Sequence, residues 1–118
     1  MLKIDKQNIT LTRGDTAYLR FRPRIRINDN PIADYTFVEG DSVVFRLKKD
    51  DGIFEKNCVI DLENNTAILT LVPADTIGLQ IKAYIYEVEL ITQYNEHFTF
   101  VADQYFTIGK EVEEHGNE

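Results

Sequence analysis

The chain of 118 residues has no tryptophan, one cysteine, one methionine and two histidines. A lone cysteine, Cys58, excludes an internal disulfide, and its apolar surroundings in the sequence predict a small core residue rather than a reactive thiol. His97 and His115 have no partners at the spacing of metal ligands, and a structural zinc site cannot be built around one cysteine. We therefore expect no metal site.

The residues from which catalytic sites are usually built are also scarce. The only serine, Ser42, stands in Gly-Asp-Ser-Val, which lacks the second glycine of a nucleophile elbow. There is no glycine-rich phosphate loop, and the adjacent acids Asp50 and Asp51 fall in a turn, where solvation explains them. We expect no catalytic residue, no cofactor and no enzymatic activity.

Long apolar runs are missing as well. No window approaches 18 uncharged apolar residues, and the N-terminus lacks a basic region followed by an apolar one. The sequence thus predicts neither a transmembrane span nor a signal peptide, and no partner in the membrane.

Charge is abundant but unevenly distributed. Residues 1–60 carry 11 Lys and Arg against 9 Asp and Glu, whereas residues 61–118 carry 2 against 11, within a net charge of −7. An acidic chain argues against nucleic acid as a partner. The asymmetry is compatible with self-association through complementary faces.

The clearest pattern lies in residues 15–27, where apolar and basic residues alternate. Period-two alternation places the two sets on opposite faces of a β-strand. The polar face would carry Tyr18 and the arginine stripe, which comprises Arg20, Arg22, Arg24 and Arg26. A neighbouring acidic strand, an acidic partner, nucleic acid or plain solvent could each offset these charges, and the stripe is a candidate interface.

Pro23 lies in the middle of this predicted strand and has no amide hydrogen to donate. We therefore expect the strand to bend, to lie on a sheet edge, or to contribute its two halves to different sheets.

Seven strands separated by turn residues are expected in all. They cover residues 8–13, 16–27, 42–49, 53–61, 66–72, 83–92 and 98–108, with a helical turn within 74–79. The spacing is typical of an all-β, immunoglobulin-like antiparallel β-sandwich. Residues 1–109 would form this single domain, and residues 110–118 an acidic flexible tail.

The expected strand order pairs 42–49 with 83–92, and 83–92 with 98–108. Arg46 and Lys48 would then face Glu87 and Glu89 across neighbouring strands. Four apolar side chains would share that outward face and form a contact surface: Val44, Ile85, Ile91 and Val101.

Two other functional interpretations remain open. Tyr35, Tyr94 and Tyr105 could stack on sugars if at least two of them lined one groove, which would make the chain a carbohydrate- or ligand-binding module. The acidic balance alone would suit a protein that mimics DNA. Arg13-Gly14-Asp15 matches an integrin-recognised tripeptide, but a tight turn between strands accounts for it.

Four segments in this order resemble the small immunoglobulin-like domains of phage and prophage tail and baseplate proteins of Gram-positive bacteria, in particular the N-terminal domain of baseplate upper proteins. These are I-T-L-T-R-G-D-T-A-Y-L-R-F (9–21), G-D-S-V-V-F-R-L-K (40–48), L-T-L-V-P-A-D-T (69–76), and Y-I-Y-E-V-E-L (84–90) leading to F-T-F-V-A-D-Q-Y-F-T-I-G (98–109).

The resemblance implies a virion structural protein without catalytic residues, which binds other tail or baseplate proteins or itself. It would be located in the virion tail, or in the bacterial cytoplasm when expressed from a prophage. Baseplate upper proteins usually continue into a coiled or receptor-binding region, from which this sequence departs.

Overall fold

A computed structural model describes residues 1–111. Apart from Lys110 and Glu111, the acidic tail predicted for residues 110–118 lies outside this range. The described chain forms eleven strands and one short helix: β1 (Leu2–Asp5), β2 (Asn8–Thr12), β3 (Ala17–Phe21), β4 (Arg24–Ile25), β5 (Ala33–Asp34), β6 (Ser42–Lys49), β7 (Gly52–Asn57), β8 (Val59–Asp61), β9 (Thr66–Leu71), α1 (Pro73–Thr76), β10 (Ala83–Ile91) and β11 (His97–Gly109).

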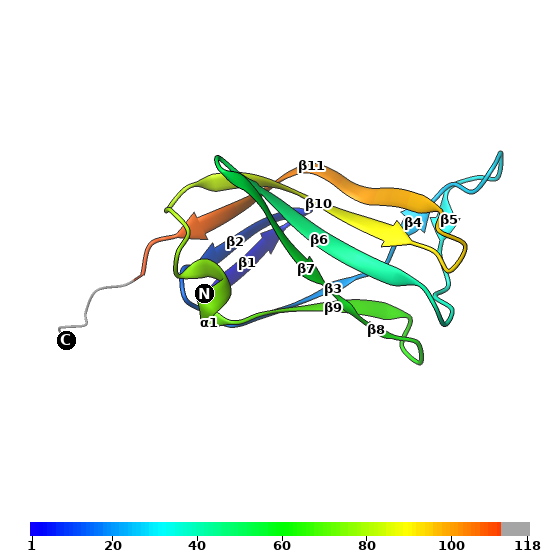
Figure 1. The fold of residues 1–118 in the computed structure, drawn as a ribbon, viewed down its shortest axis with the longest axis horizontal. Coiled ribbons are helices and arrows are strands. Elements are labelled where there is room, and N and C mark those ends of the chain that lie inside the picture. Colours follow the sequence, from blue (N-terminus) through cyan, green and yellow to red (C-terminus); the bar gives the residue numbers. More distant parts are fainter. Residues whose placement is uncertain (112–118) are drawn as a thin grey trace.

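Two sheets face each other in a sandwich (Figure 1). The larger sheet has the order β1-β2-β11-β10-β6-β7 and the smaller one β3-β9-β8, while β4 and β5 pair separately. The expected pairings of β6 with β10 and of β10 with β11 are confirmed. The only parallel pairing in residues 1–111 joins β2 to β11. This distribution of strands matches an immunoglobulin-like sandwich, so the predicted all-β class is confirmed.

Two predicted strands are each divided between sheets. Residues 16–27 form β3 and β4, which separate at Arg22 and Pro23, so the halves do belong to different sheets as the proline indicated. Pro23 is fully buried, and its carbonyl accepts a hydrogen bond from the Tyr35 amide at 3.0 Å. Residues 53–61 likewise divide at Cys58 into β7 and β8.

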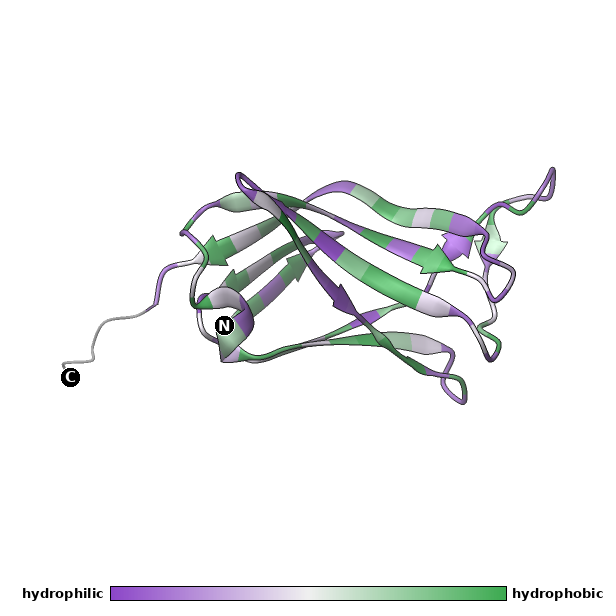
Figure 2. Cartoon of the chain, in the orientation of Figure 1, coloured by the Kyte–Doolittle hydropathy of each residue, from purple (hydrophilic) through white to green (hydrophobic). Residues whose placement is uncertain are grey.

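Apolar side chains alternate along the strands and fill the space between the sheets (Figure 2). The expected inward set of β10 (Tyr84, Tyr86, Val88 and Leu90) is buried. Phe45 of β6, Tyr86 of β10 and Phe106 of β11 contact one another, with ring centroids 5.5 to 6.1 Å apart. Aromatic rings in such edge-to-face contacts contribute packing beyond the area that they bury.

Strand β11 contains two irregularities that the sequence did not predict. Glu89 and Val88 of β10 pair with Thr99 and Val101, and Tyr86 pairs with Gln104, so β11 has one extra residue at each of two bulges. The bulges turn Val101 into the core and leave Ala102 exposed. The predictions that Val101 faces outward and Ala102 inward are therefore wrong, because each bulge shifts the alternation by one residue.

The helical turn α1 begins with Pro73 at its first position, where the missing amide hydrogen costs nothing. The Asp75 carboxylate accepts hydrogen bonds from the Val72 amide at 2.8 Å and from Lys56 Nζ at 2.6 Å. No helix within residues 1–111 has the length and apolar character needed to cross a membrane.

Candidate interaction surfaces

The outward face of the six-stranded sheet has an ion-pair cluster around Arg46. Its guanidinium binds Glu55 of β7 at 2.7 Å and Glu89 of β10 at 2.8 Å, and it lies 3.5 Å from Glu87. His97 adds a contact to Glu89 at 3.1 Å. The predicted contact of Arg46 with Glu87 and Glu89 is thus present, whereas Lys48 lies opposite Ile85 rather than an acid.

Hydrogen bonding sets the protonation of this cluster. The bonds from Glu89 and Glu55 raise the pKa of Arg46. Burial alone would raise the pKa of Glu89, but hydrogen bonds from Arg46 and His97 lower it overall. The cluster is therefore a fixed set of opposite charges, not a proton donor or acceptor near neutral pH.

The four predicted apolar contact residues differ widely in exposure. Ile85 is 39% exposed and Ile91 half-buried, both on the outward face. Val44 also points outward, beside Glu89 and Asn57, but is only 6% exposed. Val101 lies in the core. The structure thus does not expose these four side chains as one apolar surface.

A different apolar row crosses this face. The strand registers place Tyr105 of β11 opposite Ile85 of β10, Ile85 opposite Lys48 of β6, and Lys48 opposite Ile53 of β7. Tyr105 and Ile53 are 53% and 60% exposed. We call Tyr105, Ile85, Lys48 and Ile53 the exposed row. Sequence reasoning missed it, because it depends on the registers of four strands.

The arginine stripe lies on a second surface, the flank of the sandwich where β3 and β4 run. All four arginine side chains are exposed. Arg22 Nε donates to Thr66 Oγ1 at 3.3 Å, and Arg24 lies 3.6 Å from an exposed Asp34 carboxylate. No acidic strand faces the stripe, since the partner of β3 is β9, where Arg20 pairs with Ile68 and Tyr18 with Thr70.

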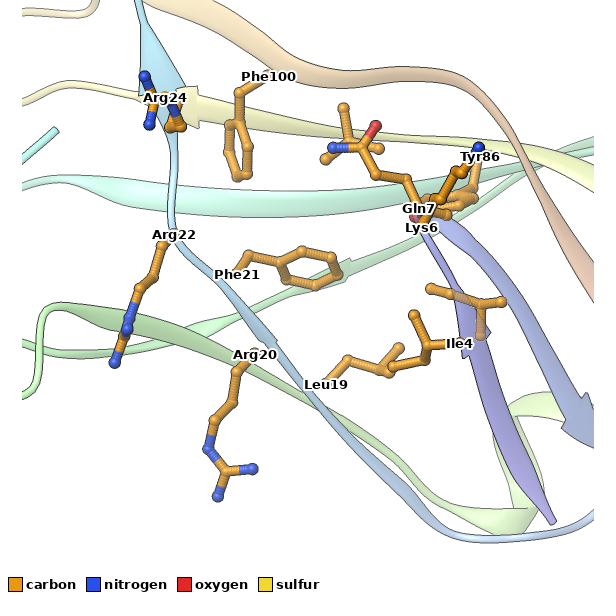
Figure 3. A pocket seen from close by; sticks show the side chains of 12 residues that line it. Ile4, Lys6, Gln7, Leu19, Arg20, Phe21, Arg22, Arg24, Tyr86 and Phe100 are labelled. Atoms are coloured by element: carbon orange, nitrogen blue, oxygen red, sulfur yellow. Dashed lines mark hydrogen bonds between the residues drawn. The ribbon is translucent and has the colours of Figure 1, made fainter. Parts of the chain in front are cut away.

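A cavity of about 270 Å³ opens on this flank (Figure 3). Its apolar lining includes Leu19 and Phe21 of β3, Ile4 of β1, and Phe100 of β11. Leu19 and Phe21 point toward the space in front of Ile4, while Arg20 and Arg22 extend on the other side of β3 (Figure 3). The strand β3 therefore borders the cavity with its backbone and separates an apolar interior from a basic exterior.

A second, more open hollow continues along the same flank. It is lined by Arg24, Ile25, Arg26, Ile32, His97, Phe98 and Thr99. Arg24 lines both spaces, so together they form one groove, which we call the flank groove. Lys6 and all four arginines border it, and no Asp or Glu is among its lining residues in the described chain.

The edge of β3 that faces the flank groove has no strand partner within residues 1–111, because β3 ends the order β3-β9-β8. Such an edge presents unpaired amide and carbonyl groups to solvent. These groups bind another extended chain as readily as they bind water.

Other predicted sites receive less support from the geometry. Tyr35 lines two small hollows, but neither Tyr94 nor Tyr105 lines any of the four cavities described in residues 1–111. The two-tyrosine groove needed for sugar stacking is therefore not formed in those cavities. Within the described residues, no three His, Cys, Asp or Glu side chains gather as metal ligands would.

Comparison with family models, with curated proteins and with solved structures finds no match to this chain.

Proposed function

We propose that this chain is a structural protein of a phage or prophage tail or baseplate, which acts by assembling with neighbouring proteins and not by catalysis. The observation that carries assembly is the exposed row on a rigid sheet face. The phage context rests on the sequence resemblance alone.

The composition of this face suits a contact surface. Protein interfaces combine an apolar, often aromatic centre with a polar rim, and tyrosine is enriched in them. Here Tyr105, Ile85 and Ile53 supply the apolar groups, and the Lys48 stem lies between two of them. The Arg46 cluster runs alongside at the next outward positions of the same strands. A flat sheet needs little rearrangement to bind, so the entropic cost of ordering is small.

The proposed partner is a second copy of the chain or another tail or baseplate subunit. A direct test is light scattering of the purified protein over a wide concentration range. We expect concentration-dependent oligomers for the native sequence and a monomer for Ile85→Glu.

Val59→Glu is the matched control, because Val59 is 71% exposed on β8 of the smaller sheet. It introduces the same charge outside the exposed row and should leave the oligomers intact. A native protein that stays strictly monomeric at high concentration, with no contact at Ile85 in an experimental structure, would contradict self-assembly through this face.

The phage context needs its own experiment. Mass spectrometry of purified tail particles, released from the source strain after prophage induction, should detect the chain at a fixed ratio to the other tail proteins. Particles that lack the chain although it is expressed would contradict a place in the virion.

A further inference from the structure

We infer that the flank groove binds an extended segment of a partner protein in which acidic and apolar residues alternate, and that this segment adds to β3 as a new strand of the smaller sheet. This site is separate from the exposed row, so its test is independent of the self-assembly test above.

The backbone of β3 supplies the first reason. Its outer edge is unpaired within residues 1–111, and the flank groove opens directly beside it. An extended segment placed along this edge would satisfy the free amide and carbonyl groups with the regular hydrogen bonds of a sheet.

The two sides of β3 then dictate the sequence of that segment. Strand residues alternate between faces, so every second side chain of an added strand would enter the cavity beside Leu19 and Phe21. The remaining side chains would lie on the outer face beside Arg20 and Arg22. Apolar residues suit the first set of positions and carboxylates the second.

Charge complementarity narrows the partner further. The lining of the groove contains five permanent cations, namely Lys6 and the arginine stripe, and no carboxylate among the described residues. Arg20 and Arg26 have no ion-pair partner within residues 1–111, so an acidic ligand would meet charges that are already exposed. Acidic residues in the bound segment would also speed its encounter with the flank.

Nucleic acid fits the same cations less well. Single strands are held largely by stacking of bases on exposed aromatic rings. On the outer face of β3 the only aromatic side chain is Tyr18, and Phe21 and Phe100 meet edge to face inside the cavity. The net charge of −7 opposes a polyanion at long range as well.

The test uses a fluorescent peptide of alternating glutamate and valine, with phenylalanine in place of one central valine. Three control probes accompany it: the same residues in two separate blocks, the alternating peptide with methylated backbone amides, and single-stranded DNA of equal charge. Binding to the intact chain is followed by fluorescence anisotropy and by NMR. We expect the alternating peptide to bind best and to slow hydrogen exchange at every second amide of β3.

Arg20→Glu with Arg22→Glu should weaken this binding by about tenfold or more, because two favourable charge pairs become repulsive. Lys3→Glu with Lys48→Glu is the matched control, since both lysines are exposed and neither lines the groove. Native-like NMR spectra of both double variants establish that they fold.

Equal binding by the block peptide or by the methylated peptide would overturn strand addition. Tighter binding by DNA would overturn the choice of partner. No binding by any probe, or binding that leaves the β3 amides unchanged, would overturn the site itself.

Discussion

Phe21 of β3 and Phe100 of β11 meet edge to face between the two sheets, with ring centroids 6.4 Å apart and an interplanar angle of 71°. This contact joins the smaller sheet to the larger one at the cavity. Leu19, Phe21, Tyr86 and Phe100 all border that space, as the expected packing of β3 against β10 and β11 implied.

Phe21→Ala should lower the free energy of unfolding by about 2 kcal/mol, which is less than a fully buried phenylalanine contributes, because Phe21 is half-buried. Chemical denaturation measures the change. Ile53→Ala, an apolar truncation at an exposed position of β7, should change stability by less than about 0.5 kcal/mol. Equal losses in the two variants would contradict a packing role for Phe21.

Arg46→Met should destabilise the fold by about 1 to 2 kcal/mol at neutral pH, because Glu55, Glu87 and Glu89 lose their shared partner. Arg24→Met is the control, since the Arg24–Asp34 pair is exposed and such pairs contribute little. Thermal unfolding of both variants and of the native chain gives the comparison.

The same pair predicts a pH dependence. The pKa of Glu89 in the folded state is lowered from its ordinary value of 4.5, so the carboxylate form is favoured by folding. The stability from this shift is fully present above pH 4.5 and is lost as the pH falls through the folded pKa. The difference between the native chain and Arg46→Met should therefore shrink on acidification. A difference that stays constant down to pH 2 would contradict this linkage.

Gly40→Ala should destabilise the chain by about 1 to 3 kcal/mol. Gly40 has a φ of +98°, and an added Cβ would lie 2.8 Å from Cβ of Gln93. Gly78→Ala provides the control, because an added Cβ there meets nothing within 4 Å. Denaturant midpoints of the two variants test whether the close approach of these two loops requires glycine.

Cys58 should react slowly with thiol reagents in the native chain at pH 8. Burial raises its pKa to about 12, so the reactive thiolate is scarce. In denaturant the same thiol should react fast, and absorbance of a released chromophore follows both rates. Native reaction at the denatured rate would show that the site where β7 passes into β8 opens readily.

Sequence patterns were sufficient where a strand keeps strict alternation. They predicted the pairing of Arg46 with Glu87 and Glu89, the inward residues of β10, and the division of the 16–27 strand at Pro23. They failed where pairing departs from alternation. Val101 was misplaced because a bulge has no residue signature, and β1 was missed because Leu2–Asp5 is short and pairs only with β2.

The candidate surfaces were predictable only in part. The arginine stripe and its exposure follow from residues 20–26 alone. The exposed row does not, because Ile53 and Tyr105 are 52 positions apart and become neighbours of the same row only through the intervening strands. The groove beside β3 required knowledge of which strand lies at the sheet edge.

The two bulges of β11 together behave like a pair of compensating frameshifts. Phe98 and Phe100 before them, and Phe106 and Ile108 after them, share one parity, while Val101 between them has the other. Removing one residue between the bulges would therefore invert one end of the strand, whereas removing one at each bulge would restore a single frame. Relatives of this chain can thus differ by paired gaps in residues 100–104 and keep the same core.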